Sequence, residues 1–216
     1  MTAKGYTDIT VLVDRSGSMS AIKTEMESGF AVFAERQRDE FLGMDGSVSK
    51  QEKCLLTVTQ FDDGNPAEPV YVQCPITESF SNFSIVPRGN TPLLDALGKA
   101  ITTTGERLAA LPEPARPDRV LFVVVTDGQE NASRDWKKST LESQIKEQRE
   151  KYGWQFTFIG ANYENFAEAS ALGIQTGAIL SGSSIYGLWT SVSSSAARFV
   201  ATAKLAYSVD ERTRSA

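Results

Sequence analysis

Hydroxyl and carboxylate side chains occupy three turn-like segments of the sequence. They are Asp14, Ser16 and Ser18 after a first apolar run, Thr91 in a Gly-Asn-Thr-Pro turn, and Asp127 after a second apolar run. Two carboxylates and three hydroxyls form a set of hard oxygen ligands with no sulfur or nitrogen donor. Such a set suits Mg²⁺, with Mn²⁺ as a substitute and Ca²⁺ less suitable because it prefers more ligands.

The positions of these side chains predict that they lie close together. Asp14 and Asp127 end the most hydrophobic runs of the chain, residues 8–13 and 119–126, which are typical of parallel strands covered on both faces. Ligands of open α/β sheets bind just beyond the carboxyl ends of such strands. Thr91 opens a predicted helix on the same edge, so we expect the five side chains to converge there.

Runs of β-branched and aromatic residues alternate with stretches whose apolar residues recur every three or four positions, which favours parallel strands with crossover helices. The predicted fold class is α/β: a three-layer, Rossmann-like, doubly wound sheet, mostly parallel with one antiparallel edge strand, and with helices on both faces. Strands are expected at residues 8–13, 54–61, 70–74, 119–126, 154–159 and near 174–176, and helices over 22–41, 91–111, 140–151, 165–172 and 182–207.

We expect a single domain over residues 1–216. Its core covers about 6–180, the long closing helix over about 182–207 packs on the sheet, and residues 208–216 form a fraying tail. Cys54 and Cys74 lie in the predicted hairpin. With a turn near Gly64 they would face each other at a distance that permits a disulfide, although a reducing cytosol favours two thiols.

Composition excludes several function classes. The chain of 216 residues is 41% hydrophobic and 23% charged, as expected of a globular protein, and its net charge of −5 disfavours nucleic acid and anionic membranes as partners. The absence of histidine excludes imidazole zinc sites and Ser-His-Asp or Cys-His nucleophiles. The sequence starts without an apolar leader, and no run approaches the roughly 18 apolar residues of a membrane span. We therefore expect a cytoplasmic location.

The three motifs together resemble the von Willebrand factor A-type (VWA) domain. The resemblance rests on Asp-x-Ser-x-Ser after the first strand, the threonine of the Gly-Asn-Thr-Pro turn, and Thr-Asp-Gly after a central strand, and it extends over about residues 6–180. In that family these residues form the metal-ion-dependent adhesion site (MIDAS). The resemblance implies that Ser16, Ser18 and, in the ligand-competent state, Thr91 touch the ion, whereas Asp14 and Asp127 act largely through water.

Neutral hydroxyls leave the charge of a cation partly uncompensated, so the ion accepts one further anionic ligand. In the family that ligand is typically an Asp or Glu carboxylate of a partner protein. The resemblance therefore implies a metal-dependent protein-binding module and no enzymatic activity. The oligomeric state is open.

Simpler interpretations exist for each residue. Ser16, Ser18 and Thr91 could cap helices, and Asp14 and Asp127 could be ordinary aspartates at strand ends. A structural role without metal is a further alternative.

The main enzymatic alternative is a magnesium-dependent phosphatase of the haloacid dehalogenase type, with Asp14 as nucleophile. That family has a second acid two residues later, where this chain has Ser16, and its motif lysine has no obvious counterpart. It also leaves the Gly-Asn-Thr-Pro turn unexplained. A nucleotide-binding switch is less favoured, since no Gly-x-x-x-x-Gly-Lys loop occurs.

Overall fold

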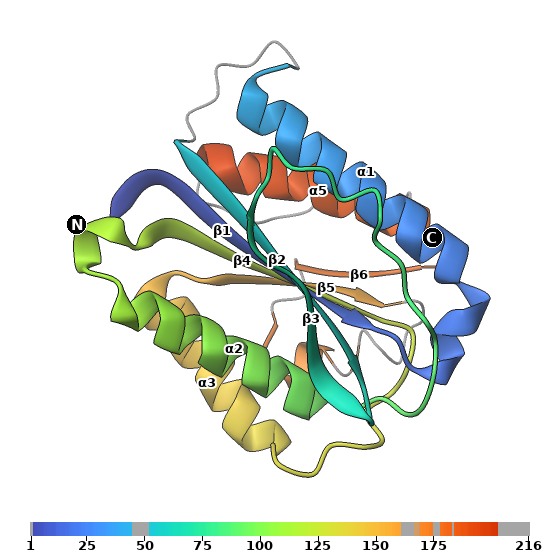
Figure 1. The fold of residues 1–216 in the computed structure, drawn as a ribbon. Coiled ribbons are helices and arrows are strands. Elements are labelled where there is room, and N and C mark those ends of the chain that lie inside the picture. Colours follow the sequence, from blue (N-terminus) through green and yellow to red (C-terminus); the bar gives the residue numbers. More distant parts are fainter. Residues whose placement is uncertain are drawn as a thin grey trace.

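Six strands form one sheet in the order β3-β2-β1-β4-β5-β6 (Figure 1). The computed structural model describes residues 2–44, 52–160, 167, 169–174, 178–182 and 184–202. All neighbouring strands pair in parallel except β2 and β3, which are antiparallel. The elements are β1 Ala3–Asp14, α1 Lys23–Leu42, β2 Lys53–Asp62, β3 Asn65–Pro75, α2 Leu93–Ala110, β4 Pro117–Thr126, α3 Lys138–Tyr152, β5 Gln155–Gly160, β6 Ile179–Ser181 and α5 Ile185–Thr202, with short 3₁₀ helices at Gly17–Ala21 and Glu113–Ala115.

Strand β1 lies at the centre of the sheet because both of its edges are paired and both of its faces are covered. Ile9, Val11 and Val13 belong to the core beneath α1 and α5, whereas Leu12 belongs to the core beneath α2 and α3. Successive side chains of a strand point to opposite faces, so the apolar end of β1 supplies both cores. This accounts for the continuous apolar run in the sequence.

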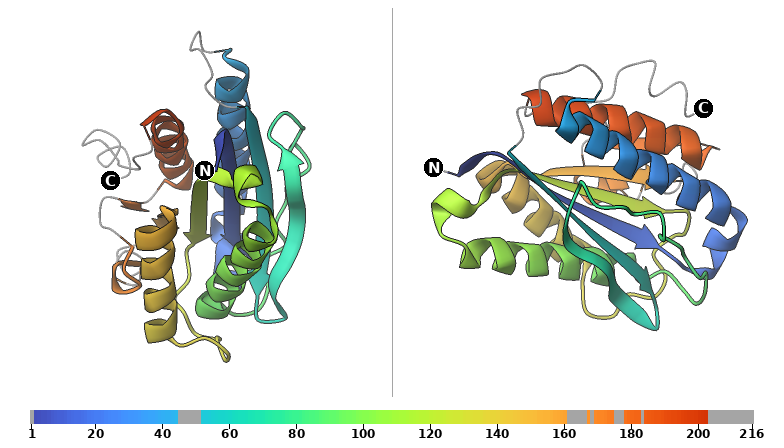
Figure 2. Two further views of the ribbon diagram at one scale, coloured as in Figure 1. Left: turned by 90° about the vertical axis from the view of Figure 1, so that its left-hand side faces the viewer. Right: turned by 45° about the horizontal axis from the view of Figure 1, so that its top comes forward.

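Helices α1 and α5 pack together on one face of the sheet, and α2 and α3 cover the other (Figures 1 and 2). Trp189 of α5 is fully buried against α1, where a Cβ on Gly29 would lie 2.2 Å from its Cδ1. Gln37 interrupts the apolar stripe of α1 and donates to the backbone carbonyl of Ser193 at 3.3 Å. The predicted three-layer fold class is thus confirmed.

Some predicted boundaries are wrong. Helix α2 begins at Leu93, with Pro92 as its N-cap and no side-chain hydrogen bond at the cap, so Thr91 does not cap it. The last strand is Ile179–Ser181; Ile174 is not in a strand, and the rest of the predicted strand at 174–176 lies outside the described residues. The end of the predicted closing helix, residues 203–207, and the tail at 208–216 also lie outside them.

The predicted opposition of the two cysteines is wrong as well. Cys74 pairs with Leu56, and the backbone N–H of Ile76 donates to the carbonyl of Cys54. The register is thus displaced by two residues from the one that a simple turn at Gly64 predicts, because β3 contains irregular positions where the pairing shifts. Both cysteines are free thiols, as expected.

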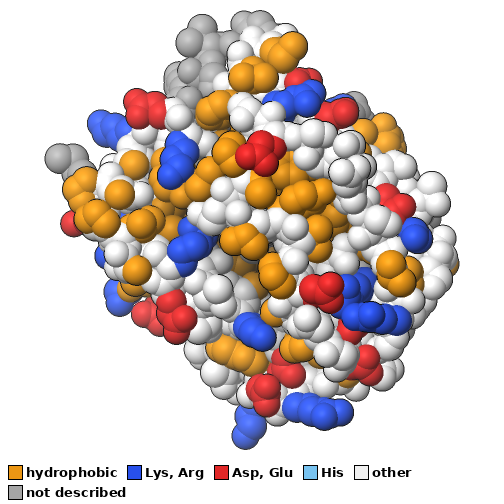
Figure 3. Space-filling model, in the orientation of Figure 1, with side chains coloured by type: hydrophobic (Ala, Val, Ile, Leu, Met, Phe, Trp, Pro, Cys, Tyr) orange, Lys and Arg blue, Asp and Glu red, His pale blue; other side chains and the backbone are white. Residues whose placement is uncertain are grey.

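Acidic and basic side chains are interspersed on the face shown in Figure 3. Within the described part of the chain, no helix combines the length and the apolar character needed to cross a membrane.

A buried ion pair connects three elements on the α2 side of the sheet. Asp8 of β1 is fully buried and accepts two hydrogen bonds from the guanidinium of Arg107 in α2, at 2.9 and 3.0 Å. Gln73 of β3 donates to Asp8 and accepts from Arg107, and the Tyr6 hydroxyl also donates to Asp8. The network holds α2 and the edge strand β3 to the central strand.

We expect Arg107→Met to lower the free energy of unfolding by roughly 2–3 kcal/mol, because it leaves the Asp8 carboxylate buried without its cation while the guanidinium itself is partly exposed. Urea unfolding followed by tryptophan fluorescence measures the effect. Adding Asp8→Asn to this variant should restore part of the loss, since the uncompensated charge is then gone. An unchanged urea midpoint in Arg107→Met would contradict this account of the pair.

Candidate metal centre

The carboxylate of Asp14 is fully buried at the carboxyl end of β1. Its Oδ1 accepts the backbone N–H of Ser16 at 2.6 Å, and its Oδ2 accepts the hydroxyl of Thr126 at 2.6 Å. Thr126 ends β4, the strand that pairs with β1, so the parallel register brings the two residues together. These contacts orient the carboxylate at the edge where the strands end.

The two serines after β1 form a chain of hydroxyls that leads to the second aspartate. The Oγ atoms of Ser16 and Ser18 lie 3.1 Å apart, and the Ser18 hydroxyl donates to Oδ1 of Asp127 at 2.7 Å. Ser16 is the N-cap of the 3₁₀ helix Gly17–Ala21, but its side chain makes no hydrogen bond that caps this helix. The capping interpretation of the two serines is therefore not supported.

The hydroxyl of Thr91, from the turn before α2, lies close to the side chains of Asp14 and Ser18. A Cβ built on Gly128 would lie 2.6 Å from Oγ1 of Thr91, 3.4 Å from Oδ2 of Asp14 and 3.4 Å from Oγ of Ser18. Three oxygens, two from the segment after β1 and one from the turn before α2, thus border the space that the missing side chain of Gly128 leaves free. The five residues predicted from the sequence are brought together at one edge of the sheet, and any side chain at position 128 would enter the space between them.

Burial of the two aspartates disfavours their charged forms. Desolvation raises the pKa of Asp14 from 3.8 to about 6, although its hydrogen bonds with Thr126 and Ser16 act in the opposite direction, and the charge of Asp127 raises it further. Desolvation also raises the pKa of Asp127, against the effect of its bond with Ser18. A cation beside these carboxylates would favour the ionised form of both.

The turn between β2 and β3 is hydrogen-bonded to the loops at the carboxyl edge of the sheet. Arg15 is buried and its Nε donates to Asp62 at 2.6 Å, and Arg88 donates to the same carboxylate at 2.8 Å. Asn90, next to Thr91, donates to Asp63 at 2.6 Å. The side chain of Arg15 therefore points away from Asp14 and Asp127, and it connects the loop after β1 to the β2–β3 turn.

Sequence reasoning missed several residues that build the site. The hydroxyl of Thr126 orients Asp14 and also accepts the backbone N–H of Gly128 at 3.0 Å. Its signal was present in the Thr-Asp-Gly motif. Glu130, Asn131 and Asp95 also support the loops, as described below. The polar character of residues 127–135 was the only signal for Glu130 and Asn131, whereas Asp95 lies in the first turn of α2, where the helix dipole alone favours an acid.

The donor set fits a hard divalent cation. Among the described residues, no cluster of three or more carboxylate or thiol side chains could hold a metal, so an ion at this edge would depend on hydroxyl oxygens as well. The residues that could hold it are Asp14, Ser16, Ser18, Thr91 and Asp127. Hydroxyl and carboxylate oxygens with no soft donor are the ligands of Mg²⁺, Mn²⁺ and Ca²⁺.

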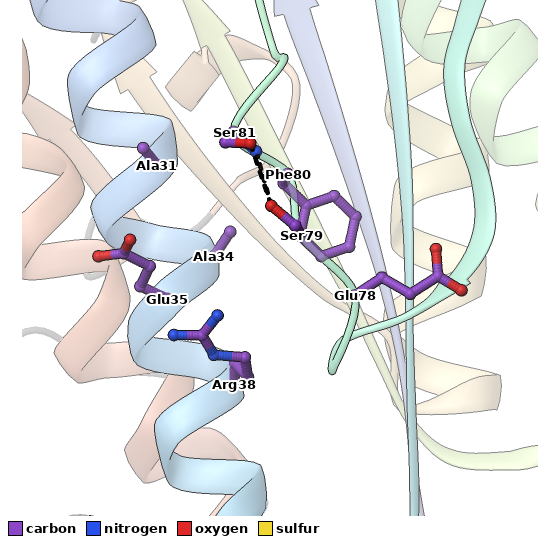
Figure 4. Close-up of a pocket in the computed structure, with 8 residues that line it drawn as sticks. All are labelled: Ala31, Ala34, Glu35, Arg38, Glu78, Ser79, Phe80 and Ser81. Atoms are coloured by element: carbon purple, nitrogen blue, oxygen red, sulfur yellow. Dashed lines mark hydrogen bonds between the residues drawn. The ribbon is translucent and has the colours of Figure 1, made fainter.

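A separate small hollow lies between α1 and the loop that follows β3 (Figure 4). Its volume is about 180 Å³, and the hydroxyls of Ser79 and Ser81 lie 3.1 Å apart at its rim. It is lined by Ala31, Ala34, Glu35, Arg38, Glu78, Ser79, Phe80 and Ser81. None of these residues belongs to the candidate metal centre.

No family model and no curated protein matches the sequence. Solved structures do match the fold. Proximal thread matrix protein 1 from the mussel byssus aligns with a TM-score of 0.61 and 18% identity over 91% of this chain and 46% of the mussel chain. A second structure of that protein, described as having a zinc-occupied MIDAS motif, aligns with a TM-score of 0.58 and 17% identity over 90% and 46% of the two chains.

The von Willebrand factor domain of the type V pili tip protein Mfa5 from Porphyromonas gingivalis aligns with a TM-score of 0.60 and 10% identity over 96% of this chain and 99% of that chain. This chain spans less than half the length of the mussel protein. Identities this low show the fold alone. The chain has a VWA-like fold.

Proposed function

We propose that this chain is a metal-dependent protein-binding module, in which a divalent cation, Mg²⁺ in the first place, is held by Asp14, Ser16, Ser18, Thr91 and Asp127. The observation that carries the proposal is the convergence of Thr91, Asp14 and Ser18 oxygens on the space beside Gly128. A cation there would supply positive charge to the buried carboxylate of Asp14. The partner would contribute an Asp or Glu carboxylate.

The composition of the site favours binding of an external carboxylate. Three of the five side chains are neutral hydroxyls, so an ion held by them keeps much of its positive charge. Ser18 is exposed, which leaves the site open toward solvent. An octahedral ion would fix the position of the incoming carboxylate, and the surface around it would select the partner.

The structural neighbours support an interaction role. The neighbours include a thread matrix protein, a pilus adhesin and a pili tip protein. The zinc in one mussel structure supports a divalent metal in this fold. For this chain we favour Mg²⁺ over zinc, because the site contains neither sulfur nor nitrogen donors.

Addition of Mg²⁺ or Mn²⁺ should raise the melting temperature, since an ion that binds only the folded chain stabilises it. At an ion concentration about 100 times the Kd we expect a shift of about 5–10 °C, measured by calorimetry against an EDTA sample. Asp14→Ala and the double variant Ser16→Ala/Ser18→Ala should abolish the shift. Ser20→Ala is the matched control, because Ser20 lies in the same turn but bonds to the carbonyl of Gly17. If neither ion raises the melting temperature of the unmutated protein, the proposal is wrong.

Metal affinity should rise with pH around the pKa of Asp14, which burial raises to about 6. Because the ion binds the ionised carboxylate, we expect the Mn²⁺ affinity to increase by about tenfold between about pH 5 and about pH 7. Without metal, the free energy of unfolding has the opposite dependence on pH. The folded chain holds this proton more tightly than the unfolded chain, so stability falls as pH rises from about 4 to about 6.

The reversed dependence can be isolated by comparison with Asp14→Asn, which does not titrate. In EDTA, the stability of the unmutated protein relative to this variant should decline across that range of pH. A constant difference between the two proteins would show that the raised pKa is absent.

The phosphatase alternative makes a different prediction. A screen with small phosphoesters should detect no magnesium-dependent turnover if the chain is a binding module. Turnover that Asp14→Asn abolishes would assign Asp14 as a nucleophile and replace the binding proposal.

A further inference from the structure

The loop after β4 forms a reciprocal pair of hydrogen bonds with Thr91, two residues before α2. The backbone N–H of Thr91 donates to Oδ1 of Asn131 at 2.9 Å, and the backbone N–H of Asn131 donates to the carbonyl of Thr91 at 3.1 Å. Thr91 and Asp127 are 36 positions apart in the sequence. This pair places Thr91 directly against the loop that begins with Asp127.

Two carboxylates extend the contact along the first turn of α2. Glu130 accepts the backbone N–H of Leu94 at 2.9 Å and also binds the backbone of Ala132 and Ser133. Asp95 of α2, 7% exposed, accepts the backbone N–H groups of residues 134, 135 and 136 at 2.8–3.0 Å. Each carboxylate thus satisfies backbone donors of the loop, and the two together span residues 130–136.

An apolar contact completes the attachment. A Cβ on Gly98 would lie 2.2 Å from Cδ2 of Trp136 and 2.4 Å from its Cε2, so the indole lies directly on the backbone of α2. Only glycine at position 98 permits this approach. Residues 127–136 are therefore fastened to α2 by hydrogen bonds at its start and by ring packing one turn further on.

We propose that Asp95, Glu130 and Asn131 are positioning residues that join α2 and the 127–136 loop into one support and thereby set the distance between Thr91 and Asp127 at the metal centre. This inference rests on the proposed function. None of the three side chains need touch the ion, since each acts through the backbone of the loops that carry the ligands. The geometry also implies that Thr91 cannot shift along the α2 axis unless residues 127–136 move with it.

The size of the effect distinguishes positioning from stability alone. Residues that orient metal ligands through hydrogen bonds typically change metal affinity by about 10- to 100-fold when they are replaced. Asp95→Asn retains one carbonyl oxygen but presents an amide N–H₂ to one of the three backbone donors. We expect the Kd for Mn²⁺ to rise by about tenfold or more in this variant.

The experiment measures the Mn²⁺ Kd by titration calorimetry at neutral pH, together with amide hydrogen exchange and the melting temperature in EDTA. Asp118→Asn is the matched control. Asp118 accepts the backbone N–H of Gly5 at the opposite end of the sheet, so its replacement removes a carboxylate contact without touching the support. Gly98→Ala is the second test variant, because it displaces Trp136 and leaves every polar group in place.

The inference requires that Asp95→Asn and Gly98→Ala both raise the Mn²⁺ Kd. In metal-free Asp95→Asn, amide exchange at residues 134–136 should also accelerate. The control Asp118→Asn should leave the Kd within about twofold, even if its melting temperature falls by the same amount. An unchanged Kd in Asp95→Asn, with unmutated protein that binds Mn²⁺, overturns the positioning role and leaves the proposed function standing. A loss of affinity equal to that of Asp118→Asn at equal stability also overturns it. Failure of the unmutated protein to bind Mn²⁺ overturns both proposals.

Discussion

The carboxylate of Asp14, buried where the central strand ends, is the constraint on which this edge of the molecule depends. A buried carboxylate is costly unless donors surround it. Its donors include the backbone N–H of Ser16 and the hydroxyl of Thr126. The first requires the loop to turn back immediately after β1, and the second requires β4 to pair beside β1. The turn that satisfies Asp14 also brings Ser16 and Ser18 to the same side, so one local requirement assembles three of the five residues of the candidate metal centre.

Much of this arrangement could be predicted from the sequence because it depends on patterns that are local in the chain. The apolar runs that end at Asp14 and Asp127 identify two buried strands, and the ends of parallel strands meet at one edge whatever lies between them. Helix α1 was predictable for the same reason, because its apolar residues recur every three or four positions, with Gln37 among them. That glutamine is buried and serves as a hydrogen-bond donor to α5, which the pattern alone did not explain.

What could not be predicted depends on contacts between distant segments. The register of Cys54 and Cys74 follows from irregular pairing in β3, and no local pattern indicates where pairing shifts. The start of α2 was misplaced because a Thr-Pro pair is a good capping signal, whereas the backbone N–H of Leu94, which a capping Thr91 could satisfy, donates to Glu130 instead. The role of Asp95 was missed for a further reason. Its partners are backbone N–H groups, which nearly every residue carries, so they leave no trace in the sequence.

A difference in hydrogen bonding separates the carboxylates that support the site from the one that we assign to the ion. Asp95 is nearly as buried as Asp14 but receives three backbone donors along a loop that it holds in place. Asp14 accepts the backbone N–H of Ser16 and the hydroxyl of Thr126, and burial still raises its pKa to about 6. A carboxylate that is needed only for structure gains nothing from a raised pKa, because a further donor or an amide in its place would relieve the cost of burial. Under the proposed function a cation would favour the ionised carboxylate of Asp14, and the oxygens of Ser18 and Thr91 border the same space beside Gly128.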